Sequence, residues 1–211
     1  GLLPERGSIS KGEVYFRGES LSRKSEKAFQ KIRGNQISMI FQVSMTSLNP
    51  VYKVGRQMTE QLLLHKIATK GNVRDMAVKT LSSVGVSAPE QRLSEYPHQL
   101  SGGLRQRVMI AMAIGCNPSL LIADEPTTAL DVTIQAQILE LIKSIVQKNQ
   151  MSVLFITHDL GVVAETCDRV VVMYAGKKIE EASIYELFAK PLHPYTVGLM
   201  QSIPQIDRVL D

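Results

Sequence analysis

The sequence predicts an α/β protein with a mostly parallel sheet and a helical insert. Short apolar runs that end in polar residues are typical of buried parallel strands, and they occur at 36–41, 120–123 and 153–157. From Leu120 onward such runs alternate with helical patterns, which favours right-handed strand–helix–strand units. Between Val54 and Gly85 the apolar residues instead recur at helical spacing. We therefore expect a helical segment at about 43–100 inside an α/β chain.

The first half of the chain predicts a strand, a helix, a second strand and then the helical segment. Residues 13–16 are a short aromatic run that favours a strand, and a charged helix is expected over 25–32. The strand at 36–41 places Gln42 at its carboxyl end. The two helical stripes that follow consist of apolar residues at steps of three and four: Met58, Leu62, Val73, Met76, Ala77 and Leu81.

The second half predicts helices and strands in alternation. Helices are expected over 104–114 and 132–148, and the strand at 153–157 is expected to be buried. Two apolar runs with the two-residue turn Ala175 and Gly176 between them predict a β-hairpin over 169–180.

Composition excludes several classes of protein. With 211 residues, 44% of them hydrophobic, the chain is long enough to bury a core without a disulfide or metal. Cys116 and Cys167 are too few for a disulfide framework. No apolar run approaches the roughly 20 residues of a membrane span, and the first residues carry no signal-peptide pattern. The net charge of +4 comes from scattered residues, so we expect no nucleic-acid partner.

Polar side chains follow three of the predicted strands: Gln42, then Asp124 with Glu125, then His158. Ligands of open parallel sheets bind at the carboxyl ends of the strands. A buried carboxylate needs a partner, and Asp124 could hold Mg²⁺, which takes one or two carboxylates beside phosphate oxygens and water. Glu125 could orient or deprotonate a water molecule. The alternative is that Asp124 only caps the following turn.

A glycine pair opens the predicted helix at 104–114. Ser101, Gly102 and Gly103 let the backbone approach a ligand closely, and the free N–H groups of a helix start attract anions. Taken alone, these residues are a weak signal, and a flexible helix start explains them better than an anion site. The spacing from Gly103 to Asp124, and from Asp124 to His158, leaves room for a helix and a strand each time. We therefore expect the strand-end residues at one edge of one sheet.

These motifs, in this order, resemble the nucleotide-binding subunit of an ATP-binding cassette (ABC) transporter over essentially the whole chain. Residues 100–107 (LSGGLRQR) are similar to the family signature, and residues 120–124 resemble the Walker B strand. The other matches are Glu125 with the catalytic glutamate, residues 128–131 with the D-loop, Gln42 with the Q-loop glutamine and His158 with the switch histidine. The resemblance implies a P-loop NTPase-like ABC ATPase core that uses ATP and Mg²⁺.

The resemblance also implies a role for each site residue. Catalysis is expected from Glu125, which polarises the attacking water, His158, which contacts the γ-phosphate, and Gln42. Magnesium ligands are expected to be Asp124 and Gln42. The expected nucleotide-binding residues are Ser101, Gly102, Gly103, Gln106 and Asp131, with residues 101–103 of one copy facing the ATP of another.

Within the family, three segments look like the dipeptide/oligopeptide importer branch, which also includes nickel importers: SLNP at 47–50, HPYT at 193–196 and SIP at 202–204. The sequence departs from this branch at Val43 and Ser44, where Asp-Pro is usual, and at Leu104, where Met or Gln is commoner. Without proline the backbone φ is less restricted there, and without aspartate a local side-chain acceptor is lost.

The implied partners are transmembrane permease subunits, a second ATPase subunit that is either a copy or a paralogue, and, indirectly, a periplasmic or extracellular solute-binding protein. Peripheral attachment to the cytoplasmic face of the membrane is expected. The implied domains are a partial ATPase core at 1–42, a helical subdomain at 43–100 that receives a coupling helix, further core at 101–181, and a C-terminal helix with the start of a family-type extension at 182–211.

One motif of the family is missing from the sequence. ATPases of this kind need a Gly-x-x-x-x-Gly-Lys-Ser/Thr loop, which wraps the phosphates. The pair Gly176 and Lys177 is followed by a second lysine, and no glycine stands five positions before Gly176. Gly7 and Gly12 have the right separation, but Glu13 follows Gly12 where the loop needs a lysine. The resemblance places the loop upstream of Gly1, so we expect an N-terminally truncated chain that by itself neither binds ATP tightly nor hydrolyses it. The alternatives are a non-catalytic docking fragment and a soluble ABC ATPase of repair or translation.

Overall fold

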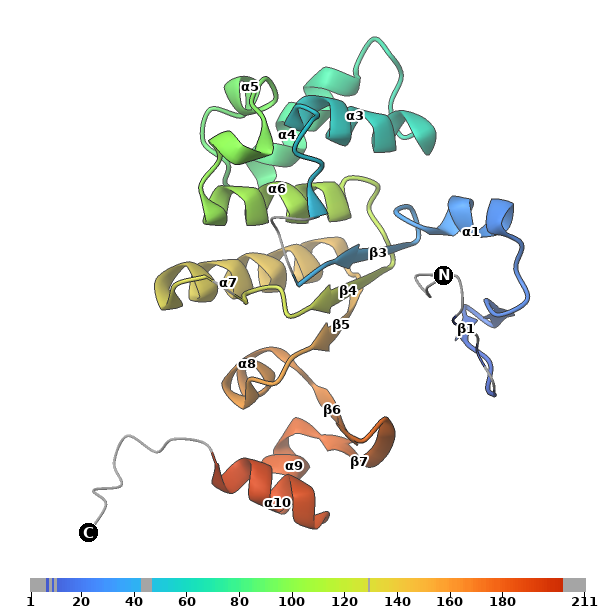
Figure 1. Cartoon of the computed structure of the whole chain (residues 1–211), viewed down its shortest axis with the longest axis vertical. Helices are drawn as coiled ribbons and strands as arrows, with labels where there is room; N and C mark the ends of the chain where they lie inside the picture. The colour runs from blue at the N-terminus through green and yellow to red at the C-terminus, as the bar shows by residue number, and fades with distance from the viewer. Residues whose placement is uncertain (1–6, 8, 10, 43–46, 129, 203–211) are drawn as a thin grey trace.

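A three-stranded parallel sheet lies at the centre of the protein (Figure 1). The computed structural model describes residues 7, 9, 11–42, 47–128 and 130–202. The strand order is β3 (Ile37–Ile40), β4 (Leu120–Asp124) and β5 (Ser152–Ile156). Antiparallel hairpins precede and follow this sheet in the chain: β1 (Tyr15–Phe16) with β2 (Glu19–Ser20), and β6 (Arg169–Tyr174) with β7 (Lys177–Ser183). The predicted combination of parallel and antiparallel strands is confirmed.

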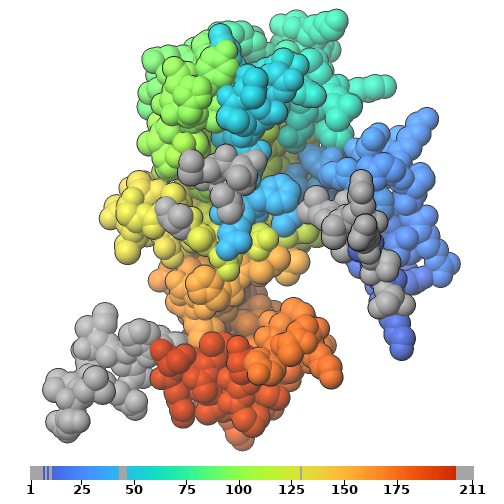
Figure 2. All heavy atoms as spheres, in the orientation of Figure 1, coloured from blue at the N-terminus to red at the C-terminus, as the bar shows by residue number. Residues whose placement is uncertain are grey.

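Helices surround the sheet in three groups. The helical segment contains α3 (Val54–Leu64), α4 (Val73–Ser83), α5 (Pro89–Arg92) and the short 3₁₀ helix η1 (Pro97–Gln99). Helices α1 (Glu26–Ile32), α6 (Gly102–Ile114), α7 (Val132–Asn149) and α8 (Leu160–Thr166) connect the strands, and α9 (Ile184–Ala189) and α10 (Pro194–Gln201) follow β7. In Figure 2 the helical segment lies at the top, and β6, β7, α9 and α10 form a lobe at the bottom.

The β6–β7 hairpin has the turn that its sequence predicts. Ala175 and Gly176 both have a positive φ, of 48° and 74°. Two consecutive residues of positive φ make a turn whose twist matches that of the flanking strands, and glycine adopts this conformation at little cost. The predicted hairpin is therefore confirmed.

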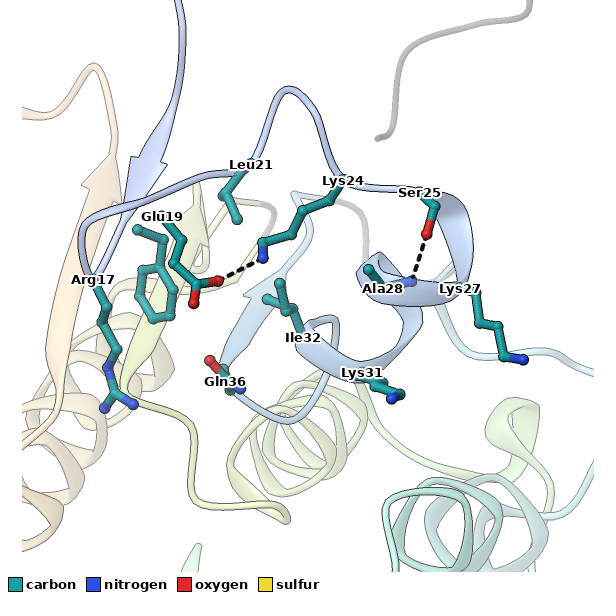
Figure 3. A pocket seen from close by; sticks show the side chains of 11 residues that line it. Arg17, Glu19, Leu21, Lys24, Ser25, Lys27, Ala28, Lys31, Ile32 and Gln36 are labelled. Carbon is teal, nitrogen blue, oxygen red and sulfur yellow. Dashed lines mark hydrogen bonds and ion pairs between the residues drawn. The ribbon is translucent and has the colours of Figure 1, made fainter.

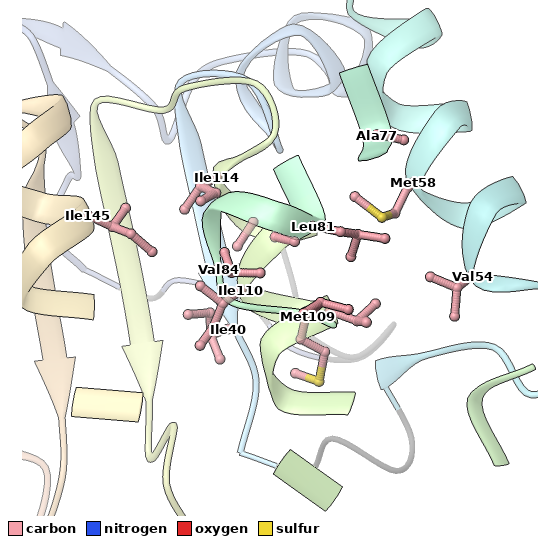
Figure 4. Packing of buried hydrophobic residues seen from close by; sticks show 14 of the residues in the cluster. Ile40, Val54, Met58, Ala77, Leu81, Val84, Met109, Ile110, Ile114 and Ile145 are labelled. Atoms are coloured by element: carbon pink, nitrogen blue, oxygen red, sulfur yellow. The ribbon is translucent and has the colours of Figure 1, made fainter. Parts of the chain in front are cut away.

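The main apolar core lies between the sheet and the helical segment (Figure 4). Helix α6 contacts β3, α3, α4 and α7, so it is the helix through which the sheet and the helical segment pack together. Ile110 of α6, Leu81 of α4 and Ile40 of β3 are each fully buried in this core. The apolar stripes seen in the sequence thus face this core.

The expectation of a buried strand at 153–157 is wrong. Leu154 and Ile156 of β5 are 52% and 45% exposed. Leu154 pairs in register with Ile122 of β4, whereas the neighbouring Leu121 is buried in the core on the other face of the sheet. An apolar run has the same sequence whether one or both of its faces are covered, so periodicity could not reveal this exposure.

The C-terminal helix is attached to β7 by one carboxylate. Glu180 accepts hydrogen bonds from the backbone N–H groups of Leu192 and His193, at 2.7 and 3.1 Å. The rings of Tyr174 and Tyr195 pack beside this contact with centroids 4.6 Å apart. Nowhere in the described ranges does a helix have the length and apolarity that crossing a membrane requires.

Candidate functional site

The carboxylate of Glu125 joins the ends of three parallel strands. Gln42 follows β3 and donates from Nε2 to Glu125 Oε2 at 2.6 Å. His158 follows β5 and places Nδ1 3.0 Å from Glu125 Oε1. The prediction that these three side chains meet at one edge of the sheet is confirmed. We refer to Gln42, Glu125 and His158 as the strand-end cluster.

The backbone turns sharply at Glu125. Its N–H still donates to the carbonyl of Ile156 at 2.9 Å, so the ladder with β5 continues to this residue. Its φ is +44°, a left-handed conformation that costs free energy for any residue except glycine. Such strained positions persist where the surroundings fix them, and they concentrate at functional sites.

Thr128 is a third contact of this carboxylate, and sequence reasoning missed it. Its hydroxyl donates to Glu125 Oε2 at 2.9 Å, and its backbone N–H donates to the Glu125 carbonyl at 3.2 Å. The sequence signal was the turn Glu-Pro-Thr-Thr, because proline favours the second position of a β-turn and the fourth residue then returns to the first.

The strand-end contacts favour the ionised form of Glu125. The hydrogen bond with His158 lowers the pKa of the Glu125 carboxyl, those with Thr128 and Gln42 act in the same direction, and partial desolvation opposes them. A carboxyl whose pKa lies below its ordinary value is negatively charged at neutral pH. An ionised carboxylate is the form that can accept a proton from water.

Asp124 fits the predicted magnesium ligand. It is the last residue of β4 and is half-buried, and its carboxylate makes no hydrogen bond or ion pair with the described part of the chain. Gln42 uses its amide nitrogen toward Glu125, which leaves its carbonyl oxygen for another partner. Both atoms are hard oxygen donors of the kind that Mg²⁺ takes beside phosphate oxygens and water. The described residues contain no group of three His, Cys, Asp or Glu side chains that could hold a metal ion.

The signature residues lie against α7 rather than against Glu125. Ser101 caps α6, with Oγ accepting from the N–H of Leu104 at 3.4 Å. A Cβ added at Gly103 would stand 3.2 Å from Cγ2 of Ile134, so glycine here allows close packing. A Cβ added at Gly102 would lie 3.9 Å from Cδ2 of Leu130, just before α7, which is an ordinary van der Waals contact. Within one chain, residues 101–103 are therefore not joined to the strand-end cluster.

Gln106 and Asp131 have partners inside the chain. Gln106 is 3% exposed, and its amide donates to the carbonyl of Pro126, which ties α6 to the turn after β4. Asp131 caps α7 by accepting from the N–H of Ile134 at 3.0 Å. Their contact with a nucleotide stays a prediction.

A hollow of about 570 Å³ lies between the β1–β2 hairpin and α1 (Figure 3). Four cationic side chains line it: Arg17, Lys24, Lys27 and Lys31. Lys24 pairs with Glu19 at 2.6 Å. The strand-end cluster contributes no residue to this hollow.

The sequence matches two family models. The model described as ABC transporter matches residues 2–128. The chain belongs to the ABC transporter family. A second model, described as the C-terminal region of oligopeptide/dipeptide transporters, matches residues 179–211, which include the β7–α10 contact.

Curated relatives from Bacillus subtilis are similar over nearly all of this ABC chain. The oligopeptide transport ATP-binding protein AppD is 58% identical over 97% of the chain and 62% of its own length. The dipeptide transport ATP-binding protein DppD is 54% identical over 98% of the chain and 62% of its own length. The chain thus spans about three fifths of the length of the curated relatives it matches.

Solved ABC cassettes share the fold. A dimeric ATP-binding cassette in a post-hydrolysis state, bound to ADP and Pi, has a TM-score of 0.72 and 28% identity. A second dimeric structure, of a bacterial ABC transporter cassette, has a TM-score of 0.71 and 28% identity. Each comparison covers 83% of this chain and 74% of the other. The predicted fold class, an α/β ABC ATPase core, is confirmed.

Proposed function

We propose that this chain supplies the water-polarising part of an ATPase subunit that drives the import of dipeptides and oligopeptides. The observation that carries the proposal is the Glu125 carboxylate at the carboxyl edge of a parallel sheet, held between Gln42 and His158. The names of the relatives AppD and DppD, an oligopeptide and a dipeptide transport ATP-binding protein, support the transport of peptides.

The strand-end cluster suits phosphoryl transfer, in which the protein mainly positions groups and stabilises charge. Glu125 polarises the attacking water, and His158 stabilises the charge that develops on the γ-phosphate. Asp124 and the carbonyl of Gln42 would hold Mg²⁺, which neutralises phosphate charge when it is bound. Residues 101–103 would face ATP held by a second subunit. Gln106 and Asp131 would belong to the same nucleotide-binding surface.

Tight binding of the ATP phosphates needs a phosphate-binding loop in addition to the strand-end cluster. The printed sequence contains no Gly-x-x-x-x-Gly-Lys-Ser/Thr run, whose backbone N–H groups and lysine hold the phosphates of ATP in such enzymes. The proposed activity therefore belongs to a subunit that combines this chain with such a loop. We call it the loop-containing subunit.

The proposed partners follow from this role. Two loop-containing subunits, or one and a paralogue, form the ATPase dimer at the cytoplasmic face of the membrane. Residues 43–100 receive a coupling helix of the permease, and residues 182–211 begin an extension beyond the core at 1–42 and 101–181. A solute-binding protein outside the membrane delivers the peptide.

Uptake into proteoliposomes tests the proposal. Loop-containing subunits are assembled with the permease, ATP is added on their side, and a labelled tripeptide is presented with the solute-binding protein on the other. We expect accumulation that requires ATP and that stops with Glu125→Gln. Uptake of Ni²⁺ without uptake of peptide would contradict the proposed substrate.

A further inference from the structure

The turn after β4 attaches Thr128 to Glu125 twice. The Thr128 hydroxyl reaches Oε2 of the carboxylate at 2.9 Å, and the Thr128 N–H reaches the Glu125 carbonyl at 3.2 Å. Pro126 lies inside this turn and restricts its backbone, and the Pro126 carbonyl accepts from the buried amide of Gln106. The hydroxyl is therefore placed by a short, anchored segment.

The other two partners of the carboxylate come from different parts of the chain. Gln42 lies beyond the end of β3, and the His158 side chain, beyond the end of β5, is 82% exposed. Under the proposed function both also engage the bound nucleotide or its Mg²⁺. Thr128 lies on the same turn as Glu125, so its bond does not depend on those distant segments.

The geometry points to Thr128 as a positioning residue for Glu125: together with Gln42, its hydroxyl holds Oε2, so that Oε1, which His158 contacts here, faces the attacking water once His158 contacts the γ-phosphate. This inference rests on the proposed function. The backbone of Glu125 is strained, with φ at +44°, so the direction of its side chain has to be fixed by contacts such as that with the Thr128 hydroxyl. A carboxylate on such a turn has other rotamers, and a fixed donor three residues away selects one of them.

Substitutions at 128 separate the hydroxyl from the shape of the side chain. Thr128→Val keeps the branched shape and removes the donor, whereas Thr128→Ser keeps the donor and removes the methyl group. In the loop-containing subunit we expect Thr128→Val to lower kcat by about 10- to 100-fold, with KM for ATP within about 2-fold, because misplacing a catalytic group slows chemistry more than binding. Thr128→Ser should stay within about 3-fold of the original kcat.

Thr127→Val is the matched control, because it makes the same change one residue away without a contact to Glu125. We expect it to keep the original kcat. Thr128→Ala serves as a second donor-free variant, and circular dichroism confirms that each protein is folded. Equal losses in Thr128→Val and Thr128→Ser, a rise in KM that accounts for the loss, or an unchanged kcat in Thr128→Val would each overturn the inference.

Glu125→Gln, assayed alongside, keeps the two proposals apart. If Glu125→Gln stops hydrolysis while Thr128→Val behaves like Thr127→Val, the positioning role is wrong and the proposed function stands. If Glu125→Gln hydrolyses ATP normally, the proposed function fails, and the positioning role fails with it.

Discussion

Glu125→Gln in the loop-containing subunit is expected to lower ATP hydrolysis by roughly 10²- to 10⁴-fold, the usual contribution of a general base. The change preserves size, and the new amide oxygen can still accept the hydrogen bonds that Gln42 and Thr128 now donate to Glu125. The structure around β4 should therefore persist while the base is lost. Single-turnover hydrolysis and equilibrium ATP binding, measured on the same preparation, separate these effects.

The control for this substitution is Glu140→Gln. Glu140 is exposed on α7, and the substitution removes the same charge far from the strand ends. We expect its rate to equal that of the original protein. A normal rate in Glu125→Gln, or an equal loss in both variants, would show that Glu125 is not the base.

Ile110→Ala is expected to destabilise the protein by about 2–5 kcal/mol, the range for truncating a fully buried aliphatic side chain. Ile110 has no exposed surface and lies on α6, which contacts both the sheet and the helical segment (Figure 4). A cavity at this position removes packing contacts from the core between the sheet and the helical segment. Urea unfolding followed by circular dichroism measures the loss as a lower midpoint.

Two further substitutions show whether the loss of stability comes from burial at position 110. Ile110→Val removes a single methyl group and should cost about 0.5–1.5 kcal/mol. Leu64→Ala truncates a side chain that is 69% exposed, and it should change stability by no more than about 0.5 kcal/mol. A loss in Ile110→Ala no larger than that in Leu64→Ala would contradict the assigned core.

Much of the fold was predictable because local chemistry specifies it. Ser25 caps α1, and Ala175 with Gly176 forms the hairpin turn, as their residue types indicate. The meeting of Gln42, Glu125 and His158 was predictable because parallel strands bring their carboxyl ends to one edge.

The remaining features depend on tertiary packing, which sequence periodicity does not contain. The exposure of Leu154 follows from which face of the sheet the helices cover. The bond from Thr128 to Glu125 depends on the dihedral angles of a strained turn. The burial of Gln106 against Pro126 requires α6 and the end of β4 to pack together, although they are separate in sequence.

A crystal structure of the loop-containing Glu125→Gln subunit with ATP and Mg²⁺ tests the central claim most directly. We predict a dimer in which residues 101–103 of one copy contact the γ-phosphate held by the other. The side chain at position 125 should lie within hydrogen-bond distance of a water in line with that phosphate, and His158 should contact the phosphate oxygens. A γ-phosphate bound away from the carboxyl ends of β3, β4 and β5 would contradict the claim.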